Sequence, residues 1–367
     1  MLWSVEKIGK GHSSPSISKG VIYITGITEA HQEVLTAIDL NGNILWQTEY
    51  SPAWEKTYPE ARTAPTVDDD RVYVISGTGK VVCVDAQMGN EKWAVAGREK
   101  FGAENGRWGT AESPLIVDDK VIYTPAGNQT TLVALDKLTG KTVWTTKSLN
   151  DDGAYVSPIL VQKNNRKLIV AVTANYIIGI NAENGDIWWH YDYVKQHATG
   201  RGATINTITP VYWNGQIFVT SGYDHGGVML KLTDDLTQVS FVWFEKNLDT
   251  HHGGVIVVDG YIYGTSWLGN QMGNWLCLDW NTGSIQYEKE WKNKGSLIYA
   301  DDMLYCYEEK GGTIALVKAS PHDFEIVSSF KVPLGSGPAW THPVISAGRL
   351  YLRRGEALMV FDIKAKP

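Results

Sequence analysis

Short strand-like runs of apolar residues alternate with tight polar turns along the whole chain. Residues 21–24 (Val-Ile-Tyr-Ile) and 71–74 (Arg-Val-Tyr-Val) are typical runs, rich in the β-branched and aromatic residues that strands favour. Polar turns such as 68–70 (Asp-Asp-Asp) and 259–260 (Asp-Gly) join successive runs into pairs. This pattern predicts antiparallel strand pairs throughout the chain, and therefore an all-β protein.

A longer pattern repeats about every 40–50 residues. Each copy has an apolar run that ends in Asp or Asn, a glycine turn, and a short strand with an aromatic residue. In the third copy these residues are Asp136, Gly140 and Trp144. The equivalent anchors stand at positions 39, 85, 136, 181, 232, 279, 318 and 362. Repeats of this length with four strands each are typical of propeller blades, so we predict an eight-bladed β-propeller of four-stranded antiparallel blades.

The last copy of the repeat has only three strands. Residues 1–7 carry Trp3 at the aromatic position, so we expect them to join the C-terminal blade and close the ring without an open edge. The prediction is a single propeller domain over residues 1–367, with blades at about 13–50, 63–96, 112–147, 156–192, 208–246, 253–291, 295–331, and 342–362 together with 1–7.

Tryptophan occupies one position of the repeat in most copies. A buried tryptophan removes about 150–250 Å² from water, and ring closure needs the same contact between every pair of neighbouring blades. We therefore expect a structural docking role, rather than a functional one, for Trp3, Trp46, Trp93, Trp144, Trp189 and Trp243.

Charge and composition narrow the possible partners. The 33 Lys and Arg against 40 Asp and Glu give a net charge of −7, which argues against non-specific electrostatic binding of nucleic acid or anionic lipid. No apolar stretch approaches the roughly 18–20 residues of a transmembrane span. The chain starts Met1-Leu2-Trp3, without the basic and apolar regions of a signal peptide, so we expect none in this chain. Three isolated cysteines are too few for a disulfide scaffold.

The repeat resembles a known family. The motif Ala134-x-Asp136-x-x-Thr139-Gly140-x-x-x-Trp144 is similar to the tryptophan-docking motif of quinoprotein (PQQ-like) eight-bladed propellers, and the same spacing recurs through essentially the whole chain. This family includes PQQ-dependent alcohol dehydrogenases and non-catalytic members such as the outer-membrane assembly lipoprotein BamB. Residues 107–114 and 124–128 look closer to secreted PQQ-like repeat proteins of bacteria, which implies a periplasmic or secreted protein.

The family's redox chemistry has requirements that can be compared with this chain. Quinoprotein dehydrogenases hold PQQ between a tryptophan and a disulfide of adjacent cysteines, with Ca²⁺ ligands and an aspartate base. Here Cys83, Cys277 and Cys306 are far apart, so that clamp is missing. The triplet at 68–70 is expected in a solvated turn. His251 and His252 are adjacent, and on a strand their side chains would point to opposite faces. No GxSxG, P-loop or HExxH motif is present. We therefore predict no catalytic residue, metal or cofactor; PQQ and Ca²⁺ belong only to an alternative interpretation.

In propellers of this family ligands bind at the rim where the loops between blades meet. The extended loops here are 50–63, 97–112, 192–208, 266–274 and 332–341. They carry aromatic rings, amides and arginines, which suit a polar organic ligand or an extended peptide. Trp54, Asp224 and His225 lie in the same set of loops. The predicted rim funnel consists of Glu104, Asn105, Arg107, Trp108, Asn128, Tyr155, Arg201, His251, His252, Trp267, Trp340 and His342.

Two functions fit these observations. The first is a non-catalytic binding or scaffold propeller that takes a small polar ligand, such as a glycan fragment, or a partner protein. The alternative is a PQQ-dependent type of oxidoreductase acting on an alcohol or sugar. A structural explanation also stays open for several residues: Arg107 and Trp108 could plug the channel, and the two histidines could be hydrogen-bonded channel-lining residues.

Overall fold

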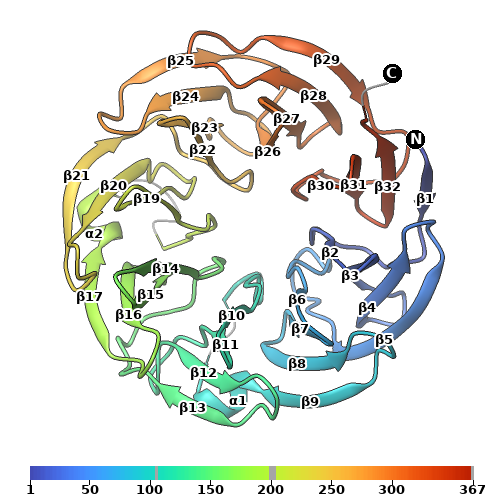
Figure 1. The fold of residues 1–367 in the computed structure, drawn as a ribbon, viewed down its shortest axis with the longest axis vertical. Helices are drawn as coiled ribbons and strands as arrows, with labels where there is room; N and C mark the ends of the chain where they lie inside the picture. The colour runs from blue at the N-terminus through green and yellow to red at the C-terminus, as the bar shows by residue number, and fades with distance from the viewer. Residues whose placement is uncertain (104–105, 198–203, 365–367) are drawn as a thin grey trace.

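Eight four-stranded antiparallel sheets are arranged as the blades of a ring in this computed structural model (Figure 1). The structure describes residues 1–103, 106–197 and 204–364. In each blade the first strand lies nearest the ring axis and the fourth lies at the outside (Figure 1). The predicted fold is therefore confirmed.

The first four blades follow the chain without crossovers. Their strands are β2 (Ser16–Ser18), β3 (Val21–Ile27), β4 (Gln32–Asp39) and β5 (Ile44–Pro52); β6 (Thr66–Asp68), β7 (Arg71–Ile75), β8 (Lys80–Asp85) and β9 (Glu91–Ala96); β10 (Leu115–Val117), β11 (Lys120–Tyr123), β12 (Val133–Asp136) and β13 (Thr142–Thr145); and β14 (Ile159–Lys163), β15 (Arg166–Val172), β16 (Tyr176–Asn181) and β17 (Ile187–Asp192).

The other four blades complete the ring. Their strands are β18 (Val211–Trp213), β19 (Gln216–Val219), β20 (Gly227–Leu232) and β21 (Val239–Glu245); β22 (Ile256–Val258), β23 (Tyr261–Thr265), β24 (Trp275–Asp279) and β25 (Ile285–Lys289); β26 (Gly295–Ala300), β27 (Met303–Glu308), β28 (Thr313–Lys318) and β29 (Ile326–Lys331); and β30 (Val344–Ser346), β31 (Arg349–Arg354) and β32 (Ala357–Asp362) with β1 (Trp3–Val5). Two five-residue helices, α1 (Gly97–Phe101) and α2 (Tyr193–His197), follow the outer strands of blades 2 and 4. No helix within the described ranges is long and apolar enough to cross a membrane.

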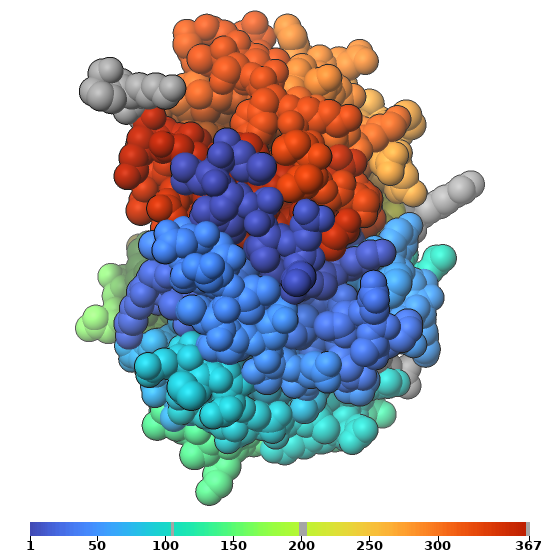
Figure 2. Space-filling model, turned by 90° about the vertical axis from the view of Figure 1, so that its right-hand side faces the viewer, coloured from blue at the N-terminus to red at the C-terminus, as the bar shows by residue number. Residues whose placement is uncertain are grey.

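The N-terminal strand closes the ring, as predicted. β1 pairs antiparallel with β32, with Trp3 opposite Val360 and Val5 opposite Leu358. In Figure 2 the first residues, in dark blue, lie directly against the red C-terminal blade. The fourth strand of the last blade thus comes from the opposite end of the chain, and the edge of β32 is covered.

A buried arginine strengthens the same junction. Arg353 on β31 is 0% exposed, and its guanidinium donates to the carbonyl oxygens of Gly9, Ser13, Thr25 and Gly355 at 2.7–3.3 Å. A buried cation is costly unless its donors are satisfied. Here three of the four acceptors, Gly9, Ser13 and Thr25, belong to blade 1 or the segment before it, so Arg353 ties the last blade to the first.

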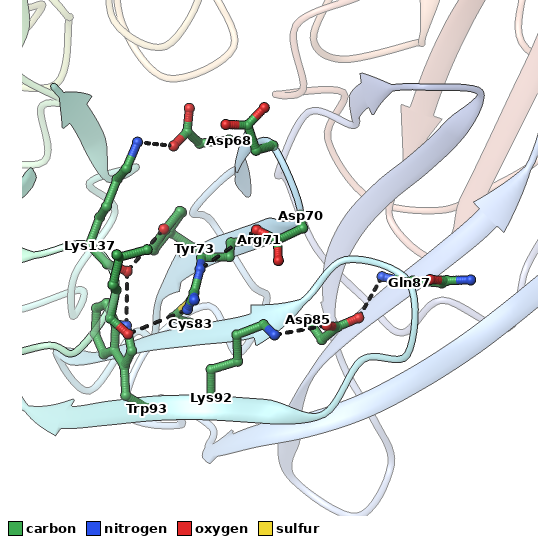
Figure 3. Close-up of polar contacts among 12 residues, drawn as sticks. Asp68, Asp70, Arg71, Tyr73, Cys83, Asp85, Gln87, Lys92, Trp93 and Lys137 are labelled. Atoms are coloured by element: carbon green, nitrogen blue, oxygen red, sulfur yellow. Dashed lines mark hydrogen bonds and ion pairs between the residues drawn. The ribbon is translucent and has the colours of Figure 1, made fainter. Parts of the chain in front are cut away.

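The repeating tryptophans lie between neighbouring blades. Trp93 donates from Nε1 to the carbonyl of Lys137 at 3.0 Å, and the hydroxyl of Tyr73 donates to the same carbonyl, also at 3.0 Å (Figure 3). Gly140 lies on the Trp93 ring with φ of +70°, and a Cβ there would be 2.7 Å from Cε3. The other five tryptophans each donate from Nε1 to a backbone carbonyl of the next blade at 2.9–3.3 Å. The pairs are Trp3 with Leu40, Trp46 with Ala86, Trp144 with Ala182, Trp189 with Leu236, and Trp243 with Trp280.

The apolar core is divided in the same way. Each of the eight buried clusters among the described residues combines side chains from two adjacent blades. Polar contacts add to these interfaces. Asp68, expected in a solvated turn, is instead partly buried at the end of β6, and its Oδ2 lies 2.6 Å from Lys137 Nζ of the next blade (Figure 3). The turn expectation overlooked this neighbour because the lysine lies one repeat further along the chain.

Candidate functional site

The loops that join the second strand to the third, and one blade to the next, lie at one end of the ring axis, which we call the rim. This placement follows from the up-and-down strand order, which puts the two remaining hairpin turns of each blade at the opposite end. Side chains from rim loops of most blades lie there, in two groups of mutual contacts. We call this group the channel cluster: His12, Tyr58, Arg62, Arg107, Trp108, Tyr155, Tyr223, His251, His252, Trp267, Lys294, Glu309 and Trp340.

Aromatic rings form one side of the channel cluster. Trp340 packs against His12, His252 and Tyr58, with ring centroids 4.8, 4.6 and 5.7 Å away. From His252 the contacts continue through His251 to Tyr223 and Trp267. Tyr223 and Trp267 are themselves 5.2 Å apart. The rings therefore form a continuous apolar wall from blade 1 around to blade 5.

Two arginines and two further aromatic residues form the other side. The Arg107 guanidinium lies 5.1 Å from the centre of the Trp108 ring, and Trp108 meets Tyr155 edge to face at 5.4 Å. Arg62 donates to the carbonyls of Thr57 and Tyr58 at 2.9 and 2.5 Å.

The two sides are close to each other. Burial, together with nearby Tyr155 and Tyr58, raises the pKa of Tyr223 to about 12, against the opposing effect of Arg107. Tyr223 lies in blade 5 and Tyr58 in the loop between blades 1 and 2, so this influence acts across the ring axis.

A buried ion pair lies beside this aromatic wall. Lys294 and Glu309 are each 2% exposed, and Lys294 Nζ is 2.5 Å from Glu309 Oε1. Lys294 Nζ is also 3.4 Å from His251 Nδ1, and Trp340 Nε1 donates to Glu309 Oε2 at 3.1 Å. Burial, assisted by the charge of Lys294, lowers the pKa of His251 to about 3, so its imidazole is neutral. Burial also lowers the pKa of Lys294, against the opposing effect of Glu309.

The adjacent histidines lie in a rim loop, but their side chains meet. His251 and His252 are in the loop between β21 and β22, and their ring centroids are 3.6 Å apart. The strand rule of alternating faces, which would separate the two side chains, does not apply to loop backbone.

The predicted rim residues are only partly brought together. Arg107, Trp108, Tyr155, His251, His252, Trp267 and Trp340 belong to the channel cluster. His342 is adjacent, with Nε2 3.1 Å from the His252 carbonyl oxygen. Asn128 is exposed in its loop and takes no part in these contacts. Three other residues of the predicted funnel, Glu104, Asn105 and Arg201, lie outside the described residues.

Three other rim residues have local roles. Trp54 is buried, and its side chain lies against Gly77 and Gly109. Asp224 is exposed, and its backbone N–H donates to Asp249. His225 is buried, with its ring 5.8 Å from that of Tyr193. None of the contacts just given joins these three to the channel cluster.

Sequence reasoning missed His12, Tyr58, Arg62, Tyr223, Lys294 and Glu309. In sequence they look like isolated polar residues of ordinary loops. The strand register could have found one pair: β26 and β27 form a hairpin in which Gly295 faces Glu308, so Lys294 and Glu309 flank its open end. The Glu309 N–H donates to the Lys294 carbonyl at 3.0 Å.

A small crevice lies at one edge of the channel cluster. It is beside Tyr155 and Glu112 and has a volume of about 20 Å³, enough for one water-sized group. In contrast, Tyr58 is 54% exposed, and on the rim loop after Trp267 the side chains of Leu268 and Met272 are 61% and 57% exposed. The rim therefore presents aromatic, apolar and basic side chains to solvent.

The cysteines do not fit the PQQ clamp of quinoprotein dehydrogenases. Cys83, Cys277 and Cys306 are all free and buried on β8, β24 and β27, within the cores between blades. They are therefore held away from the rim, and no chemical step through PQQ can be derived from them.

Eight docked blades closed by the N-terminal strand define a propeller of the quinoprotein type. The family model described as "Outer membrane protein assembly factor BamB" matches residues 30–289. The chain therefore belongs to this family of PQQ-like repeat propellers, which confirms the resemblance inferred from the docking motif. No curated protein matches the chain significantly in sequence.

Solved structures share the whole fold at low identity. BamB from Moraxella catarrhalis is similar with a TM-score of 0.68 and 16% identity, over 100% of this chain and 98% of that one. Quinohemoprotein alcohol dehydrogenase from Comamonas testosteroni has a TM-score of 0.72 and 14% identity, over 100% and 77%. The computationally designed Ika8 protein has a TM-score of 0.66 and 13% identity, over 99% of both chains. At these identities the likeness shows the fold alone.

Proposed function

We propose that this protein is a non-catalytic binding or scaffold propeller of the cell envelope, whose rim binds a partner polypeptide. The observation that carries the proposal is the composition of the rim around the channel cluster. Exposed tyrosine, arginine and methionine side chains, here Tyr58, Arg107 and Met272, are the types enriched at protein interfaces. A rigid ring of blades holds these loops in place, so little ordering is needed on binding.

The crevice beside Tyr155 is too small to enclose a small molecule, which supports a ligand that lies on the rim surface. Small-molecule sites are concave and usually enclose roughly 300–1,000 Å³, whereas the crevice beside Tyr155 holds about 20 Å³. A glycan fragment would have to lie across the rim surface. An extended peptide can do so while placing single side chains against Trp340 and Trp108, which are partly exposed.

The envelope location rests on the family. The matching family model and the Moraxella catarrhalis structure both carry the name BamB, and the family description refers to outer membrane protein assembly. We carry over the coarse expectation of a periplasmic or secreted, protein-binding propeller in a bacterium, and not a particular assembly partner.

Photo-crosslinking tests the proposed rim. A photoreactive amino acid at Tyr58 should capture a defined partner polypeptide, and the same amino acid at Trp213 should not. Trp213 is a matched control because it is 39% exposed and is the last residue of β18, beside the hairpin turn at the opposite end of the ring axis. Arg107→Glu should then weaken capture at position 58, since it reverses a charge on the rim. Equal capture at both positions would contradict the proposal.

A separate assay addresses the oxidoreductase alternative. The purified protein is incubated with PQQ and Ca²⁺, a panel of alcohols and sugars, and an artificial electron acceptor. We expect no reduction of the acceptor above the protein-free control, because the cysteines lie in blade cores rather than at the rim. Substrate-dependent reduction would replace the binding proposal with the enzymatic one.

A further inference from the structure

Three side chains with metal-ligating atoms meet beside Trp340. One nitrogen of His251, one nitrogen of His252 and one carboxylate oxygen of Glu309 all lie within 4.8 Å of one another. They come from the loop before blade 6 and from the loop after β27 in blade 7. We propose that these three residues bind a divalent transition-metal ion, Zn²⁺ above all, at the position where the ammonium group of Lys294 now lies.

The donor set fits zinc. Two imidazoles and one carboxylate form a ligand set that holds Zn²⁺ in proteins and leaves a fourth position open. Both imidazoles offer a ring nitrogen within 4.8 Å of the carboxylate oxygen, which is close enough for one ion to contact all three atoms. Hard cations such as Mg²⁺ and Ca²⁺ prefer all-oxygen sites, so they fit this pair of nitrogens poorly.

One nitrogen of each ring has no hydrogen-bond partner among the described residues. His251 is 5% exposed, and its Nε2 is buried without a hydrogen-bond partner among the described residues. The same holds within the described residues for Nδ1 of His252. Leaving a buried polar atom without a partner is unfavourable, so a ligand that engaged either of these two nitrogens would remove that penalty.

The site already holds a positive charge. Lys294 Nζ contacts both Glu309 Oε1, at 2.5 Å, and His251 Nδ1, at 3.4 Å, so a carboxylate and a ring nitrogen jointly stabilise a cation there. Lysine has a flexible stem, so its ammonium group would move aside when the metal binds. Trp340 Nε1 would continue to hold the other oxygen of Glu309, as outer-shell donors do for metal ligands.

This inference goes beyond the proposed function and does not depend on it. An ion here would link the loops of blades 6 and 7 beneath the rim whether or not a polypeptide binds above. It also predicts that one substitution increases the affinity for the metal. Replacing Lys294 should strengthen metal binding, because Lys294 competes with the metal for Glu309.

Titration calorimetry with ZnCl₂ tests the site on untagged protein freed of metal by a chelator. We expect one Zn²⁺ per chain for the wild type, and Co²⁺ should give the visible absorption bands of a nitrogen-ligated ion. His251→Ala and His252→Ala should each weaken binding by about tenfold or more, and Lys294→Met should strengthen it by about tenfold. His190→Ala is the matched control, since His190 is exposed on β17.

Every result of these titrations either supports the proposed zinc site or overturns it. Circular dichroism and the thermal midpoint establish whether each variant is folded. If His251→Ala does not fold, His252→Ala tests the histidine ligands in its place. The proposal is overturned if neither the wild type nor Lys294→Met binds Zn²⁺ or Co²⁺. It is also overturned if binding is unchanged in both histidine variants, is lost in His190→Ala, or is weakened in folded Lys294→Met.

Discussion

Trp144 offers a quantitative test of how the blades hold together. The side chain is 8% exposed, donates from Nε1 to the Ala182 carbonyl at 3.3 Å, and lies against Gly185 of the next blade. Burying about 150–250 Å² at roughly 25 cal/mol per Å² gives an upper estimate of about 4–6 kcal/mol. Measured truncations of buried tryptophan to alanine cost about 3–5 kcal/mol. We therefore expect Trp144→Ala to lower the free energy of unfolding by about 4 kcal/mol.

That loss translates into a modest change in melting temperature. An unfolding entropy of about 2.1 cal/mol/K per residue, multiplied by 367 residues, is roughly 0.8 kcal/mol/K for a ring that unfolds as one unit. The expected decrease in Tm is then about 5 °C, which differential scanning calorimetry resolves easily.

The control is the preceding residue on the same strand. Val143 is 48% exposed on β13, and Val143→Ala should change the free energy of unfolding by less than about 0.5 kcal/mol. An unchanged Tm for Trp144→Ala, or equal losses for both variants, would refute the docking role. Two separate transitions would show instead that the blades unfold independently.

The remaining predictions concern ring closure and pH. Deleting residues 1–6 uncovers the edge of β32, so we expect a lower Tm and concentration-dependent self-association, measured by light scattering. Arg353→Met leaves several buried carbonyls without donors and should cost at least about 3 kcal/mol in urea unfolding, more than Arg354→Met at the partly exposed neighbour. Burial raises the pKa of Glu112 to about 8, opposed by hydrogen bonds from Thr124. The folded state therefore retains a proton that the unfolded state has lost between about pH 5 and 8, so stability should fall as pH rises through that window. Glu112→Gln should flatten this slope in urea midpoints measured from pH 5 to 8; an identical slope in the variant would show that another group is responsible.

The fold could be predicted because each blade obeys a local rule. Asp136 shows the rule: its Oδ1 accepts the N–H groups of Leu138 and Thr139, which fixes the turn that presents Gly140 to the ring of Trp93. All of these residues except Trp93 lie within five positions of one another. Because the same short signal recurs at a steady interval, the blade count, the strand order and the closing strand followed from the sequence alone.

The membership of the channel cluster could not be predicted in full, because it depends on contacts between residues far apart in the sequence. Lys294 meets His251 across 43 positions, and Trp340 meets Glu309 across 31, through loops whose backbone follows no period. Sequence reasoning found the aromatic rim residues because large rings in glycine-rich loops are conspicuous. It missed the buried ion pair and the contact between the two imidazoles, because a charge or a histidine in a loop looks the same whether it faces solvent or the axis. Local hydrogen bonding and periodic packing determined the propeller, whereas only the convergence of separate loops at the ring axis decided which side chains meet there.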